Sequence, residues 1–191
     1  MTGLIIFGAP GAGKGTQALR IAQSLGIPAI STGDIFRDNI KNETSLGLQV
    51  KEILASGAYV PDEVTNAIVR ERLDQADAVD GFLLDGYPRT QAQAAELDEM
   101  LAAQGRSLDL VLELTVDTDE VVQRLVKRAE IDGRADDTED VIRHRLKIYD
   151  EETAPLAALY HERGLLRPVD GMGEMDEVTQ RLRVVLATPQ S

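Results

Sequence analysis

The chain has 191 residues, of which 43% are hydrophobic and 28% are charged, and a formal net charge of −13. This length and apolar content suffice for one sizeable core, whereas the negative charge argues against non-specific binding to nucleic acid. The sequence contains no cysteine, which excludes disulfide bonds and thiolate metal sites.

The first predicted elements are a buried strand over residues 4–7 and a helix over residues 16–25. The loop between them reads Gly8-Ala9-Pro10-Gly11-Ala12-Gly13-Lys14-Gly15-Thr16. A strand, a glycine-rich loop and a helix in this order are typical of a phosphate-binding loop, because glycine lets backbone N–H groups converge on one anion. The helix N-terminus and the Lys14 ammonium add positive charge. Gly15 holds the place where the usual pattern has a metal-ligating Ser or Thr, so we expect no direct metal ligand from this loop.

A second strand is predicted over residues 29–31, followed by a turn into a helix that carries Arg37. Asp34 is the expected N-cap of that helix. Further helices are predicted over residues 47–56, ending at Gly57, and from Pro61 onward. Three consecutive helices between strands indicate a small helical insert rather than a simple crossover.

An apolar run over residues 81–84 ends in Asp85, a pattern that places a carboxylate beside a phosphate-binding loop, where it can act on hydrated Mg²⁺. Residues 87–90 follow at the carboxyl end of this predicted strand, where open α/β sheets bind ligands. A helix over residues 91–104 and a strand over residues 109–116 come next. The nearly continuous apolar character of that strand predicts that both of its faces are covered.

Cations concentrate in the next segment, since seven of the 20 Lys and Arg residues lie between Arg124 and Lys147. Arg124 and Arg128 share one face of a helix predicted over residues 119–128, a like-charge spacing that costs roughly 0.2–0.5 kcal/mol. Such a local cost hints at a function, and a solvated basic face is the alternative.

The rest of the chain is predicted to alternate between loop, helix and strand. Residues 129–137 have the size and composition of a flap, and Thr138 is expected to cap the helix that follows. Pro155 should kink or restart that helix. A strand over residues 165–169 and a helix over residues 176–186 complete the predicted elements.

Four motifs follow one another in order along the chain. They are the loop over residues 8–16, Ser31-Thr32-Gly33-Asp34 with Arg37, Asp85-Gly86-Tyr87-Pro88-Arg89, and Gly133-Arg134-Ala135-Asp136-Asp137. Together they resemble the adenylate kinases, one of the nucleoside monophosphate kinase families. The resemblance runs nearly from end to end, and the brief flap is similar to the short-lid form.

The resemblance implies an α/β P-loop kinase fold, with a five-stranded parallel sheet flanked by helices. It implies a single domain over residues 1–191, with a helical AMP-binding insert at residues 31–60 and a short lid at residues 129–137. It also implies the reversible reaction in which Mg-ATP and AMP give two ADP, which maintains the balance of adenine nucleotides.

The resemblance further implies roles for individual residues. Those on ATP would be Gly11, Ala12, Gly13, Lys14, Gly15, Thr16, Arg128 and the backbone of Gly173. Those on AMP would be Thr32, Arg37, Ala58, Tyr59, Val60, Gly86, Tyr87, Pro88, Arg89, Gln93, Arg134 and Arg145. Catalysis would fall to Lys14, Asp85, Arg89, Arg124, Arg134 and Arg145, with Asp85 acting on Mg²⁺ through water and no direct protein ligand to the metal.

Three other functions were weighed against this one. A kinase acting on UMP and CMP is disfavoured by Thr32, which matches the adenine-binding members. A GTPase-like switch is disfavoured because the sequence lacks the Asn-Lys-x-Asp motif, and a purely structural domain leaves the clustered arginines without purpose. We therefore expect a cytoplasmic monomer that binds ATP, AMP and ADP but neither nucleic acid nor membrane.

Overall fold

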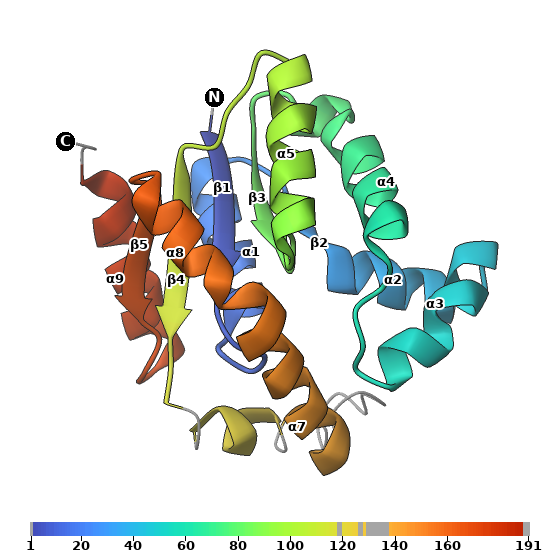
Figure 1. Cartoon of the computed structure of the whole chain (residues 1–191). Coiled ribbons are helices and arrows are strands. Elements are labelled where there is room, and N and C mark those ends of the chain that lie inside the picture. Colours follow the sequence, from blue (N-terminus) through green and yellow to red (C-terminus); the bar gives the residue numbers. More distant parts are fainter. Residues whose placement is uncertain (1, 118–119, 126–127, 129–137, 189–191) are drawn as a thin grey trace.

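A computed structural model of the chain describes residues 2–117, 120–125, 128 and 138–188. Its centre is one sheet of five parallel strands in the spatial order β2-β3-β1-β4-β5 (Figure 1). The strands are β1 (Thr2–Phe7), β2 (Ala29–Ser31), β3 (Gly81–Asp85), β4 (Leu110–Thr115) and β5 (Leu166–Asp170). The five-stranded parallel α/β fold that the sequence predicted is thereby confirmed.

Helices alternate with these strands along the chain. The bounds are α1 (Lys14–Leu25), α2 (Thr32–Lys41), α3 (Ser45–Ala55), α4 (Asp62–Leu73), α5 (Gln91–Ala103), α7 (Glu139–Ile148), α8 (Pro155–Glu162) and α9 (Met175–Ala187). A short 3₁₀ turn spans Ala76–Ala78, and a π-helical turn over Tyr149–Thr153 joins α7 to α8. Residues 120–125 and 128 are also helical.

The sheet is covered on both faces, which explains the continuous apolar runs in its strands. Ile5 and Phe7 of β1 face one core, to which α4, α5 and α8 contribute. Leu4 and Ile6 face a second core, formed largely with α1 and α9. Alternate side chains of a strand point to opposite faces, so one short strand contributes to both cores.

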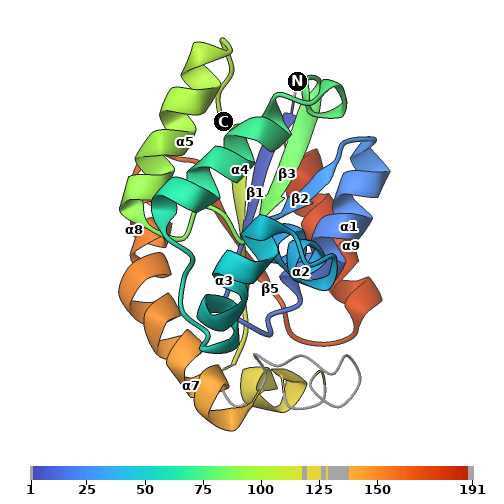
Figure 2. The same cartoon turned by 90° about the vertical axis from the view of Figure 1, so that its right-hand side faces the viewer.

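The segment from α2 to α3 projects from the β2 side of the sheet (Figure 1) and lies in front of the sheet in Figure 2. It has a small apolar cluster of its own, built around Phe36, Val50 and Val60. Gly47 lies inside α3, and this position requires glycine because a Cβ atom there would come within 2.1 Å of the Asn39 carbonyl oxygen. This close approach packs α3 directly on the end of α2.

Three details of the helices differ from what the sequence predicted. The N-cap of α2 is Ser31 rather than Asp34, because the Asp34 N–H donates to Ser31 Oγ at 3.3 Å. Helix α3 begins at Ser45 with Thr44 as its cap, two residues before Gly47. Thr138 does occupy the N-cap position of α7, but its side chain makes no capping hydrogen bond within the described residues.

Pro155 restarts the helix rather than kinking it. It is the first residue of α8, a position where the missing N–H costs nothing. The π-helical turn that precedes it is closed by the Ala154 N–H, which donates to the Tyr149 carbonyl at 2.8 Å. Extra backbone in such a turn changes the direction of side chains.

Strand β5 forms one edge of the sheet and pairs only with β4. The Leu165 carbonyl accepts from the Val111 N–H, so alternate residues of this strand bond to β4. The backbone nitrogen of Pro168, which has no hydrogen, therefore lies on the open side. No helix within the described part of the chain is long and apolar enough to cross a membrane.

Candidate nucleotide site

The loop between β1 and α1 has the backbone that its glycines predict. Gly11 and Gly13 have φ values of +87° and +91°, which favour glycine over other residues. At Gly11 a Cβ atom would also lie 2.8 Å from Leu125 Cγ and 3.1 Å from the Val121 carbonyl oxygen. Glycine at this position thus lets the helix over residues 120–125 pack directly on the loop.

Lys14 is the first residue of α1, and its side chain folds back over the loop. Its Nζ donates to the carbonyl oxygens of Gly8 at 2.7 Å and Ala9 at 2.9 Å. Burial lowers the pKa of Lys14 to about 8, and the nearby Asp85 carboxylate opposes that shift. An anion held at the helix N-terminus would favour the charged ammonium.

Asp85 ends β3 and lies next to the loop. Burial raises the pKa of this carboxyl group, and the positive charges of Lys14 and Arg89 oppose the shift. A Cβ atom at Gly15 would lie 3.5 Å from Asp85 Oδ2, an ordinary contact distance. Gly15 therefore borders the Asp85 carboxylate and presents no hydroxyl where the usual loop has a metal-ligating one.

The donors at this point suit only a loosely held metal ion. No group of three or more metal-ligating side chains occurs in the described ranges of the chain. Mg²⁺ commonly needs just one or two carboxylates, because phosphate oxygens and water complete its shell. Asp85 supplies one such carboxylate.

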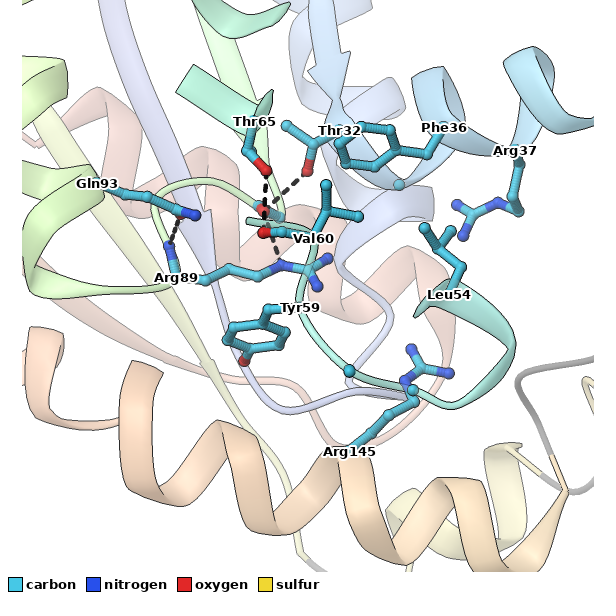
Figure 3. A pocket seen from close by; sticks show the side chains of 14 residues that line it. Thr32, Phe36, Arg37, Leu54, Tyr59, Val60, Thr65, Arg89, Gln93 and Arg145 are labelled. Carbon is cyan, nitrogen blue, oxygen red and sulfur yellow. Dashed lines mark hydrogen bonds between the residues drawn. The ribbon is translucent and has the colours of Figure 1, made fainter. Parts of the chain in front are cut away.

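A pocket opens between the helical insert and the carboxyl ends of the strands (Figure 3). Three arginines from separate elements line it: Arg37 of α2, Arg89 after β3 and Arg145 of α7. The remaining lining residues are Thr32, Gly33, Phe36, Leu54, Gly57, Ala58, Tyr59, Val60, Thr65, Gly86 and Gln93. The pocket thus combines an apolar wall from the insert with converging guanidinium groups, a composition suited to a base and a phosphate.

The backbone at Gly86 joins two of these elements. Its carbonyl oxygen accepts from Thr32 Oγ1 at 2.9 Å and from Arg89 Nε at 2.8 Å. The φ of Gly86 is +75°, and a Cβ atom there would lie 3.0 Å from Arg89 Nη2 and 3.1 Å from Thr32 Oγ1. Glycine therefore keeps these two side chains close together.

Gln93 is fully engaged within the protein. Its Oε1 accepts from the Arg89 backbone N–H at 2.7 Å, and its Nε2 donates to Asp62 Oδ1 at 2.7 Å. Asp62 Oδ2 accepts from Thr90 Oγ1 at 2.9 Å. The start of α4 is therefore tied to the loop that carries Arg89. Asp62 is a residue that the sequence did not single out.

Tyr87 and Pro88 are buried, and neither lines the pocket. The Tyr87 ring is 1% exposed and belongs to the core beneath the loop, where its hydroxyl donates to Asn66 Oδ1 at 2.7 Å. The peptide bond between the two residues is cis. Any contact of Tyr87 with a nucleotide would thus come from its backbone.

The residues expected on ATP do not line this pocket, and neither does Arg124, which was expected to act in catalysis. Arg124 donates from Nε to Glu120 Oε1 at 2.9 Å and from Nη1 to the Gly171 carbonyl at 3.2 Å. Gly173 has a φ of +95°, and a Cβ atom there would lie 2.6 Å from Glu177 Oε2. Arg128 is half-buried, whereas Arg134 and the predicted lid at residues 129–137 lie outside the described residues.

Sequence reasoning missed pocket residues that are apolar or carry no side chain. Phe36 and Leu54 come from separate helices, and each is an ordinary core residue in its own helical pattern. Gly57 was predicted only as a helix terminator, yet its hydrogen atoms leave room for Arg145. Periodicity along one element gives no signal for such contacts between elements.

Comparison with known proteins identifies the family. A family model described as adenylate kinase matches residues 6–165. Proteins named adenylate kinase from Kocuria rhizophila and Clavibacter michiganensis are 58% and 59% identical to this chain, covering 97% and 98% of it and 99% and 94% of their own lengths. One from Pseudarthrobacter chlorophenolicus is 54% identical over the whole of both chains. This chain belongs to the adenylate kinase family.

The activity of an adenylate kinase follows from this membership. The chain is an enzyme, an ATP:AMP phosphotransferase, which transfers a phosphoryl group between adenine nucleotides. The family predicted from the four motifs is confirmed, and the alternatives of a nucleotide switch and a purely structural domain are excluded. A transfer between two nucleotides requires that both be held at once, and the structure offers a glycine-rich loop and a separate arginine-lined pocket.

Proposed function

We propose that ATP lies with its phosphates over the loop of residues 11–16 and that AMP lies in the pocket of Figure 3. The observation that carries this assignment is the convergence of Arg37, Arg89 and Arg145 on a pocket beside the carboxyl end of β3. Planar guanidinium groups pair with two phosphate oxygens at once, which both binds and orients an acceptor phosphate.

Thr32 and the apolar wall would select the base. The Thr32 hydroxyl donates its proton to Gly86, so its lone pairs remain to accept from an amino group. Adenine presents such an amine, whereas uracil and guanine present carbonyl oxygens at the corresponding edge. Phe36 and Val60 would cover the ring.

The reaction requires alignment of the two nucleotides and neutralisation of the phosphate charge rather than a general base. The acceptor phosphate is already an anionic nucleophile, and the arginines would hold it in line with the terminal phosphate of ATP, whose charge Lys14 would neutralise. Mg²⁺ bound to ATP would neutralise the phosphate oxygens, with Asp85 holding its water ligands. Closure of the lid segment over both nucleotides would exclude water as a competing acceptor.

Arginine substitutions test this assignment. We expect Arg89→Ala to cost about 3 to 5 kcal/mol of transition-state stabilisation, the scale of losing a preorganised charged contact. The matched control is Arg143→Ala, because Arg143 lies on the solvent side of α7 and pairs with Glu139. ADP formation is measured under saturating ATP and AMP. An Arg89→Ala enzyme that is folded and as active as Arg143→Ala would refute the assignment.

Acceptor specificity tests the role of Thr32. We expect initial rates to be highest with AMP, followed by CMP, UMP and GMP at far lower rates. UMP as the preferred acceptor would contradict the proposal. We further propose that the enzyme is a cytoplasmic monomer, which sedimentation at the working concentration would check.

A further inference from the structure

Arg89 is restrained at four points, two of which come from residues distant in sequence. Close in sequence, the Gly86 carbonyl accepts from its Nε, and Gln93 at the start of α5 accepts from its backbone N–H. From outside, Thr153 Oγ1 donates to the Arg89 carbonyl oxygen at 2.8 Å, and the guanidinium carbon lies 4.9 Å from the centre of the Tyr59 ring. Among the residues that the structure describes, neither Nη atom of Arg89 has a hydrogen-bond partner, so both remain available to an anion.

Tyr59 and Thr153 are themselves joined, at 2.8 Å between their hydroxyl oxygens. A carbonyl oxygen can only accept, so the single proton of Thr153 goes to Arg89. Tyr59 must therefore donate to Thr153. The result is a directed chain of hydrogen bonds from Tyr59 through Thr153 to the backbone of Arg89. Thr153 is only 5% exposed, so water competes little for these bonds.

The chain links three segments that are distant in sequence. Tyr59 lies between α3 and α4, Thr153 is the last residue of the π-helical turn, and Arg89 follows β3. Figure 3 shows the Tyr59 ring beneath the side chain of Arg89, on the α7 side of the pocket. An aromatic face at this distance attracts a guanidinium group and limits its movement.

We propose that Tyr59 and Thr153 are positioning residues for phosphoryl transfer. Their side chains hold Arg89 from outside its loop, so that its free Nη atoms face the acceptor phosphate before that phosphate arrives. Donors fixed in advance stabilise developing charge without reorganisation during the reaction. This inference rests on the proposed role of Arg89, and it concerns the Tyr59 side chain rather than the backbone predicted to touch AMP.

Four substitutions separate the hydrogen-bond chain through Thr153 from the contact between the Tyr59 ring and the Arg89 guanidinium group. Thr153→Val keeps the shape but removes both hydrogen bonds, and we expect kcat to fall about 3- to 10-fold with an unchanged KM for ATP. Thr153→Ser keeps the hydroxyl and should retain kcat within about twofold of the parent. Tyr59→Phe removes only the hydroxyl, whereas Tyr59→Leu also removes the ring, so Tyr59→Leu should lower kcat more.

A matched control distinguishes positioning from a general effect of the π-helical turn. Tyr149 lies in the same turn, and its hydroxyl has no hydrogen-bond partner within the described residues. Tyr149→Phe should therefore leave kcat unchanged. Thermal unfolding of every variant is measured so that rates refer to folded enzyme.

Combination with Arg89→Ala gives the decisive readout. If Thr153 acts through Arg89, Thr153→Val should lower kcat in the parent but cause no further loss in the Arg89→Ala background. An equal loss in both backgrounds would overturn the inference, as would parental kcat in both Thr153→Val and Tyr59→Leu. Full activity of Arg89→Ala by itself would instead refute the proposed nucleotide site.

Discussion

At the scale of single residues, the role proposed for Lys14 on the ATP phosphates implies that nucleotide binding is coupled to protonation. Because burial lowers its pKa to about 8, the ammonium of the empty enzyme loses its proton as the pH rises through that value. A polyphosphate beside the amine favours the charged form and raises the pKa again. The bound state therefore holds more protons than the free state above about pH 8.

We predict that ATP binding at pH 8.5 takes up protons. Calorimetry in two buffers with different ionisation enthalpies measures the uptake. Lys14→Arg is the matched control, because arginine keeps its charge throughout this pH range and should show no uptake from this site. The same proton uptake in the parent and in Lys14→Arg would show that another group titrates.

Single residues also show how much of the candidate site could be predicted from the sequence. Lys14, Asp85 and Arg89 stand in motifs whose spacing reflects a loop and a strand end, so they could be named in advance. Asp62 and Thr153 could not, because each acts through hydrogen bonds to segments far away in the sequence. A sequence contains no local signal for such a partner.

At the scale of elements, Gly57 sets how closely α7 approaches the pocket. Its φ is +78°, and a Cβ atom there would lie 2.8 Å from both Arg145 Cγ and Val141 Cγ1. We predict that Gly57→Ala displaces Arg145 and raises the KM for AMP several-fold. Backbone strain should also lower the free energy of unfolding by about 1–2 kcal/mol.

Gly105→Ala serves as the control for strain alone. Gly105 has a φ of +66°, but nothing lies within 4 Å of a Cβ atom there. Its substitution should cost similar stability in denaturant unfolding while leaving the KM for AMP unchanged. Equal KM values for the two variants would show that Gly57 does not position α7.

Elements were predictable in type but not in their ends. Apolar periodicity identified the strands and the long helices, because burial of one face imposes that period. The start of α2 was predicted wrongly because Ser31 and Asp34 are both good capping residues, and only the backbone decides between them. The π-helical turn before Pro155 could not be predicted, because the apolar residues around it keep ordinary helical spacing.

At the scale of the whole molecule, acidic residues outnumber basic ones, 33 to 20. Their mutual repulsion destabilises the compact state, and salt screens it. We predict that raising KCl from 10 to 100 mM, which shortens the screening length from about 30 to about 10 Å, raises the Tm by a few degrees. Differential scanning calorimetry checks this, with tetramethylammonium chloride as a control for specific cation binding. A Tm that falls with both salts would show that local ion pairs outweigh the net charge.

The architecture as a whole was predictable from the motifs rather than from charge or periodicity. The order β2-β3-β1-β4-β5 depends on which strands meet across the core, and hydrophobic pattern alone is compatible with other orders. The acidic composition gave no hint of a cationic pocket either. Its three arginines come from separate elements and gather only when the chain folds.

The two edges of the sheet affect whether copies of the enzyme can pair strand to strand. One margin is the three-residue β2, and the other has Pro168 where an incoming backbone would seek a donor. Neither border offers a continuous ladder for a foreign strand to join. Both edges therefore oppose the strand addition through which one copy would recruit the next into a fibre.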